Sequence, residues 1–410
     1  MPDVEFVNLL IIAAIAVTAP LLLGFAPRLR VPAVVLEIVA GIVVGPSGLG
    51  WVEIDLPVQI VALLGLAFLL FLAGLEFDPR RLRGPTTWLA LLGYAISIAV
   101  GLAVGVGFGA AGWVRDPLLL AVALSATSLG LVVAVLKDAG RLDGAAGQAT
   151  ITAASVADFV AIVLLSLAFS TMGGTVSGRV GSLAVFGGLV VLTGVVLAFT
   201  GRSRRLGTVL SRLQDTTAEI RVRAAVLLLV AFVALAEKFG LETILGAFLA
   251  GVVVSVVDRD TTSHPRFRIK LEAVGYGFLI PVFFVSSGVR LDLSGLVAEP
   301  AALARVPLFL VALLLVRGVP ALVFVRTLRR REVAAVALLQ ATSLPFIVTA
   351  TQIGVVLGAM SSVTAAALVC AGLLSVLVFP VSAVSLLSSR NTDQTNDGAR
   401  RVADRPTVGD

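Results

Sequence analysis

The chain has 410 residues, of which 58% are hydrophobic and 14% are charged. Soluble domains carry about 25% charged residues, so the composition excludes a soluble protein and predicts an all-α protein within a lipid bilayer. The net charge of +6 does not indicate nucleic-acid binding, because the basic residues occupy the loops between apolar segments. We therefore expect no nucleic-acid partner.

Thirteen apolar segments are long enough, or nearly long enough, to cross a bilayer. They run at about 5–27, 33–48, 57–76, 86–111, 117–137, 144–169, 179–200, 218–237, 242–257, 273–288, 302–325, 332–355 and 362–387. The two sets of alternate loops hold 25 and 5 of the Lys and Arg residues, and Arg317 is left inside a segment. Because basic residues collect on the cytoplasmic side, this asymmetry predicts a plasma-membrane protein with its N-terminus outside and its C-terminus in the cytoplasm.

The segments form one predicted transmembrane domain over residues 1–390. Residues 391–410 are rich in Asn, Asp, Arg and Gly, and we expect them to be a disordered cytoplasmic tail. The chain contains no Gly-rich nucleotide fingerprint, so we expect no cofactor.

A short repeat links the fifth and twelfth segments. The sequence Ala-Thr-Ser-Leu occurs at 126–129 and again at 341–344, which is 215 residues and seven spans later. An odd number of spans gives the two copies opposite orientations, as in transporters built from inverted repeats with broken helices. Ser and Thr compete for backbone hydrogen bonds, and Pro345 removes one. The sequence therefore predicts two broken helices that cross at the midplane.

Two charged residues lie deep inside apolar segments. Asp158 is within 151–169 and Arg317 is within 306–325. A charge at the bilayer centre costs about 2.5–3.5 kcal/mol on insertion scales, so such residues usually face a partner, a cavity or an ion path. If segments four to six and eleven to thirteen are the repeats, both residues approach the crossing. An acid and a permanently charged base at this place indicate an ion transporter.

Several segments together resemble the cation/proton antiporter superfamily, in its branch of bacterial sodium/proton and potassium/proton exchangers. These segments are 32–46, which ends in Gly-Pro, 70–76, 127–142, 245–251 and 281–288. The resemblance extends over about residues 5–387. It implies a sodium/proton antiporter-like fold of about thirteen helices and a transporter rather than an enzyme.

The resemblance also implies roles for the two intramembrane charges. Asp158 matches an Asp that binds cation and proton in alternation, and Arg317 matches a basic residue on the eleventh helix that is Arg in many electroneutral members. The chain departs from the family where Ala157 replaces the usual Asp, Asn or Gln, and where Leu344-Pro345 replaces a frequent Gly-Glu. Without a second acid beside Asp158, we expect one cation to exchange for one proton.

A carboxylate that holds either H⁺ or a monovalent metal ion couples the two fluxes, because both compete for one charge. We predict that Asp158 is this site for Na⁺ or K⁺. Oxygen atoms of Thr127, Ser128 and Ser155 are the candidate additional ligands, since hard cations prefer oxygen.

Arg317 does not lose its proton in proteins, so we assign it an electrostatic role. It could offset the negative ends of half-helices or pair with an acid, for which the candidates are Asp158 itself and Glu37, a second intramembrane acid. Glu37 and Ser343 are possible secondary ion-site residues.

Two other functions fit the same pattern. An ion channel would also use broken helices and a charged pore residue, and a sodium-coupled solute symporter shares the inverted-repeat architecture. The small-residue pairs Gly41/Gly45 and Gly101/Gly105 allow close helix packing, and we expect a homodimer in which such pairs are candidate contacts.

Overall fold

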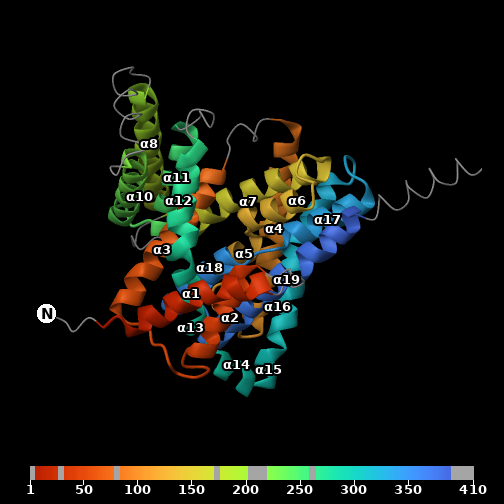
Figure 1. The fold of residues 1–410 in the computed structure, drawn as a ribbon. Coiled ribbons are helices and arrows are strands. Elements are labelled where there is room, and N and C mark those ends of the chain that lie inside the picture. The colour runs from red at the N-terminus through yellow and green to blue at the C-terminus, as the bar shows by residue number, and fades with distance from the viewer. Residues whose placement is uncertain are drawn as a thin grey trace, which may run out of the picture.

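The computed structural model describes residues 5–25, 32–77, 84–169, 176–201, 219–257 and 265–388. All regular elements in these ranges are helices, as the composition predicts (Figure 1). The predicted disordered tail at 391–410 lies outside the described residues, as do several of the basic loops.

One group of helices forms a first bundle, with α3 and α11 packed along each other and α13 packed against both α2 and α3. Its members are α1 (Val7–Phe25), α2 (Ala33–Val44), α3 (Leu56–Glu76), α8 (Val176–Gly201), α10 (Ile220–Lys238), α11 (Thr243–Val257), α12 (Pro265–Val274), the π-helix η1 (Gly275–Leu279) and α13 (Ile280–Val289). Local sequence sets several of their ends. At the start of α3, for example, the Asp55 carboxylate accepts a hydrogen bond from the backbone N–H of Val58, and Pro57 occupies the first turn.

The remaining long helices form a second bundle, in which α4 packs on α5 and α7, and α19 packs on α16, α17 and α18. Its members are α4 (Pro85–Ala110), α5 (Pro117–Ser125), α6 (Leu129–Asp138), α7 (Ala145–Ala168), α16 (Arg305–Gly318), the 3₁₀-helix η2 (Val319–Phe324), α17 (Arg330–Gln340), α18 (Pro345–Val356) and α19 (Ser362–Ser388). These are the segments predicted to be the two inverted repeats. Two short helices, α14 (Leu293–Ala298) and α15 (Pro300–Leu303), connect the bundles at one end of the molecule (Figure 1).

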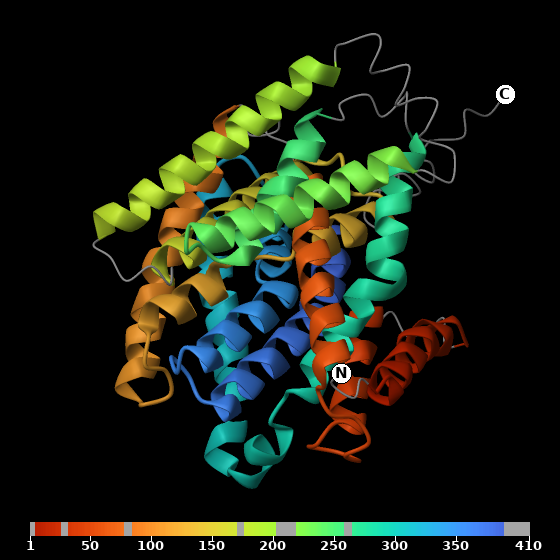
Figure 2. The same cartoon turned by 90° about the vertical axis from the view of Figure 1, so that its left-hand side faces the viewer.

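A helix, or a pair of consecutive helices, occupies each of the thirteen predicted segments. Among the described residues, nine helices are long and apolar enough to cross a membrane, and the bent pair of α17 and α18 makes ten. The other three are α2 and α11, with 12 and 15 residues, and α10, which carries charges at both ends. The structure is therefore consistent with thirteen spans. Figure 2 shows α8 and α10 running side by side across one face.

Glycines bring the helices of each bundle into backbone contact. A Cβ atom on Gly251 of α11 would overlap the carbonyl of Phe71 in α3, and one on Gly74 of α3 would overlap the carbonyl of Phe248 in α11. Gly41 of α2 meets Val285 of α13 in the same way. Such close approaches need residues without side chains. In lipid the hydrophobic effect does not drive helices together, so the van der Waals contacts made at these glycines hold them instead.

The glycine pairs that the sequence offered as dimer contacts are used inside the chain. Gly41 and Gly45 pack on α13, and Gly101 and Gly105 pack on α5. The homodimer therefore stays a prediction that these four residues do not support.

We predict that Gly251→Val destabilises the protein, because the backbone carbonyl of Phe71 leaves no room for a side chain. Overpacking of this kind costs about 1–3 kcal/mol or more. The measurement is the thermal unfolding midpoint of the purified protein in detergent. Gly188→Val in α8 is the matched control, since nothing lies within 4 Å of a Cβ atom there. Equal midpoints for the two variants would contradict the prediction.

Candidate functional site

Two helices are interrupted, and their breaks lie against each other. The chain leaves helical geometry between Ser125 and Leu129, and again between Gln340 and Pro345. The backbone N–H of Ser128 donates a hydrogen bond of 3.0 Å to the carbonyl of Thr342, which joins the two breaks. Both predicted interruptions and their crossing are therefore present.

Asp158 closes one side of this crossing. It projects from the middle of α7, and its two carboxylate oxygens accept hydrogen bonds from the backbone N–H groups of Thr127 at 3.2 Å and Leu129 at 3.3 Å. Leu129 is the first residue of α6, so the carboxylate lies at the positive end of a half-helix. The arrangement favours a negative charge here. It also leaves acceptor positions on both oxygens, because a carboxylate has about four.

Arg317 closes the other side. Its side chain is 1% exposed, and its Nε donates to the Thr127 hydroxyl at 2.9 Å and to the carbonyl of Gln340 at 3.4 Å. Its Nη1 donates to the Ser97 hydroxyl of α4 at 3.1 Å. Gln340 is the last residue of α17, so the guanidinium lies at the negative end of the opposite half-helix.

Arg317 forms no direct ion pair with Asp158 or Glu37 in the described part of the chain. Its partners are two hydroxyl groups and a main-chain carbonyl instead. Its Nη2 atom is buried without a hydrogen-bond partner. The sequence offered acids and the negative ends of half-helices as partners, and Arg317 lies at such an end, the Gln340 carbonyl of α17. Ser97 was missed because a serine in an apolar helix carries no distinctive signal.

Thr127 connects the two charged residues without either touching the other. Its hydroxyl accepts from Arg317 and donates to the carbonyl of Gln340 at 2.8 Å, while its backbone N–H donates to Asp158. The hydroxyl therefore bonds to Arg317 and the Gln340 carbonyl, whereas the backbone N–H makes the contact with Asp158. A movement of Arg317 would therefore be transmitted to Asp158 through Thr127.

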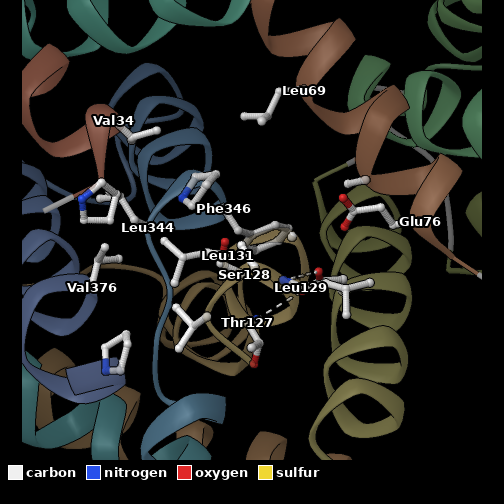
Figure 3. A pocket seen from close by; sticks show the side chains of 18 of the residues that line it. Val34, Leu69, Glu76, Thr127, Ser128, Leu129, Leu131, Leu344, Phe346 and Val376 are labelled. Atoms are coloured by element: carbon white, nitrogen blue, oxygen red, sulfur yellow. Dashed lines mark hydrogen bonds between the residues drawn. The ribbon is translucent and has the colours of Figure 1, made fainter. Parts of the chain in front are cut away.

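A cavity of about 860 Å³ opens beside the crossing. Thr127 and Ser128 line it together with Glu76, the last residue of α3 (Figure 3). Asp158 also lines it. The Oε2 atom of Glu76 is buried and has no hydrogen-bond partner. The cavity thus carries carboxylates from both bundles, Glu76 from one and Asp138 and Asp158 from the other. No cluster of three or more potential metal-ligating side chains is found among the described residues.

Comparison with known proteins agrees with this geometry. Residues 13–388 match the family described as "Sodium/hydrogen exchanger, transmembrane". The chain belongs to this family.

Two relatives and one solved structure illustrate the similarity. The putative Na(+)/H(+) antiporter YjbQ of Bacillus subtilis is 32% identical over 93% of this chain and 63% of its own length. The Na(+)/H(+) antiporter of Enterococcus hirae is 31% identical over 71% of this chain and 74% of its own. The sodium proton antiporter MjNhaP1 of Methanocaldococcus jannaschii shares the fold, with a TM-score of 0.61 at 15% identity, over 93% of this chain and 97% of that one. The chain spans less than two thirds of the length of the Bacillus relative.

The remaining candidate residues of this exchanger chain take different places. Ser155 is buried on α7 and is not among the residues that line the cavity, whereas Ser128 is. Ser343 lies in the second break, where its backbone bonds to the Ser375 hydroxyl and its own hydroxyl is buried without a partner. Glu37 is 5% exposed on α2 and does not line the cavity.

Glu76 is the residue whose importance the sequence concealed. An acid at the end of an apolar segment normally reaches water, so the position of Glu76 in the sequence does not by itself indicate a site. The available signal was its place at the end of the segment 70–76, which carries part of the family resemblance.

We predict that Thr127→Val destabilises the crossing, because it leaves the carbonyl of Gln340 and Nε of Arg317 with one partner fewer. A buried hydrogen bond to a charged group contributes about 1.5–3 kcal/mol. Thr127→Ser keeps the hydroxyl and is the matched control. The measurement is the unfolding midpoint of each variant in detergent, and a Val variant as stable as the Ser variant would refute the bridging role.

Proposed function

We propose that the chain exchanges a monovalent cation, Na⁺ or K⁺, for H⁺ across the plasma membrane by alternating access, with Asp158 as the shared site. The observation that carries the proposal is the placement of this carboxylate at a half-helix N-terminus, on the wall of a cavity. Two backbone N–H groups hold it, so it keeps free lone pairs for either a proton or a cation. Because the proton and the cation compete for the same single negative charge, one excludes the other.

The position of the cavity supports a cytoplasm-facing conformation of the protein. On the orientation predicted from the basic loops, the cavity walls extend to cytoplasmic helix ends at Pro32, Asp138 and Val384. Toward the opposite face the two bundles meet, and the Gln352 amide of α18 donates to the Ser287 hydroxyl of α13 at 3.0 Å. Alternating access then requires this contact to open while the cavity closes.

The charges at the crossing support electroneutral exchange. Ala157 supplies no second carboxylate beside Asp158, and Arg317 is a fixed charge held by Thr127, Ser97 and a carbonyl. Arg317 does not release its proton, and the charge of Glu76 is paired with that of Arg268, so Asp158 is the group that changes its charge. Each cycle accordingly moves one cation against one proton.

Asp158→Asn is expected to abolish cation-dependent proton movement, because an amide neither binds nor releases a proton in the working pH range. The measurement is dequenching of a pH-sensitive dye in proteoliposomes after addition of Na⁺, K⁺ or Li⁺. Asp143→Asn, in an exposed loop away from the cavity, is the control and should exchange normally. Retained exchange in the Asp158 variant would rule out the assignment.

Exchange by the native protein should neither create nor respond to a membrane potential. Proteoliposomes loaded with a potential-sensitive dye test this, with valinomycin and K⁺ gradients used to impose potentials of both signs. A potential generated by Na⁺-driven proton movement would contradict one-to-one exchange. Currents beyond carrier turnover would favour the channel alternative, and solute uptake without proton counterflow would favour the symporter.

A further inference from the structure

A second group of charged side chains, Arg268 and Glu272, lies beside Glu76 on the cavity wall. The helix α12 passes there into the π-helix η1, whose Tyr276 lines the cavity. Nη2 of Arg268, on α12, lies 3.6 Å from Oε1 of Glu76. Nε of the same arginine lies 2.7 Å from Oε1 of Glu272, one helical turn further along. Arg268 is thus shared by an acid inside the cavity and an acid on its own helix.

The two oxygens of Glu76 have different surroundings. Oε1 faces Arg268, whose side chain is 52% exposed, while Oε2 is buried and has no hydrogen-bond partner. Both oxygens lie beside Gly130 of α6, where a Cβ atom would be 3.2 Å from Oε2 and 3.4 Å from Oε1. The same α6 begins at Leu129, whose N–H binds Asp158. Glu76 therefore lies beside the half-helix that holds Asp158, and Arg268 is near its Oε1 atom.

We propose that Arg268 is a tethered cation that competes with the transported cation for Glu76, and so sets the apparent affinity of the cavity. This inference rests on the proposed function. An entering Na⁺ or K⁺ needs the negative charge that Arg268 partly neutralises. Because Arg268 also pairs with Glu272, it can release Glu76 without losing its last acidic partner. The exchange of partners costs little, since half-exposed ion pairs contribute only modestly.

The proposal predicts opposite effects for the two neighbours of Glu76. Arg268→Gln removes the competitor, so the KM for the cation at the cytoplasmic face should fall about two- to five-fold, the range expected for the loss of one solvent-exposed ion pair. Glu272→Gln removes the alternative partner, so that Arg268 pairs with Glu76. The competition for Glu76 then increases, and the KM should rise. Arg268→Lys keeps the charge and should lie near the native value. A role confined to anchoring α12 gives no such change of sign.

The experiment measures initial rates of Na⁺-dependent proton movement in inside-out membrane vesicles at one fixed pH, over a range of Na⁺ concentrations. Arg266→Gln is the matched control, because it removes the same charge from an exposed position on the same helix without an ion pair to Glu76. Its KM should stay close to the native value. Raising the ionic strength with a large impermeant salt should shrink the difference between the Arg268 and Arg266 variants.

The outcomes separate this inference from the proposed function. If the native protein shows no exchange, or exchange that survives Asp158→Asn, the proposed function fails. If exchange depends on Asp158 but Arg268→Gln leaves the KM unchanged or raises it, or if Arg266→Gln lowers it equally, the tethered-cation proposal is overturned. Should Arg268→Gln fail to fold, Glu272→Gln decides, and an unchanged or lowered KM in that variant rejects the proposal.

Discussion

The structure depends on a guanidinium that has no carboxylate partner. Two broken helices leave unpaired carbonyl and N–H groups in the middle of a protein that lipid surrounds, where water is scarce and each such group is costly. Arg317 lies at the carbonyl end of α17 and Asp158 at the N–H end of α6. Each formal charge thus meets partial charges of opposite sign from the backbone, and Thr127 joins the two halves.

Under the proposed exchange, this arrangement leaves Asp158 available for ions beside a permanent cation. Had Arg317 paired directly with Asp158, an entering cation would have had to displace a buried guanidinium, and breaking a buried pair is strongly unfavourable. Thr127, Ser97 and the Gln340 carbonyl hold Nε and Nη1 of the arginine instead. The carboxylate keeps only two backbone contacts, and it faces the cavity.

Much of this arrangement follows from the sequence, and the rest does not for identifiable reasons. The repeated Thr-Ser and Pro345 indicate the breaks because they act locally on backbone hydrogen bonding. The negative end of a half-helix could be expected as a partner of Arg317, but the particular carbonyl could not, because every residue has one. Ser97 could not be predicted either, since it lies 220 residues away. The place of Glu76 on the cavity wall could not be predicted, because its burial depends on how closely α6 approaches at Gly130. The dimer contacts inferred from glycine spacing were misplaced, because that spacing serves packing within a chain equally well.

The contact between Gln352 and Ser287 has a consequence for how the two faces respond to their surroundings. It is a hydrogen bond between neutral groups, so neither salt nor moderate acidity alters its strength directly. The cavity side instead carries Glu76, Arg268 and Glu272, whose interactions weaken as salt increases. Under the proposed alternating access, ionic strength therefore affects the cavity side more than the Gln352–Ser287 contact. Changes in ionic strength should act on ion entry at the cavity side and leave the seal on the other side unaffected.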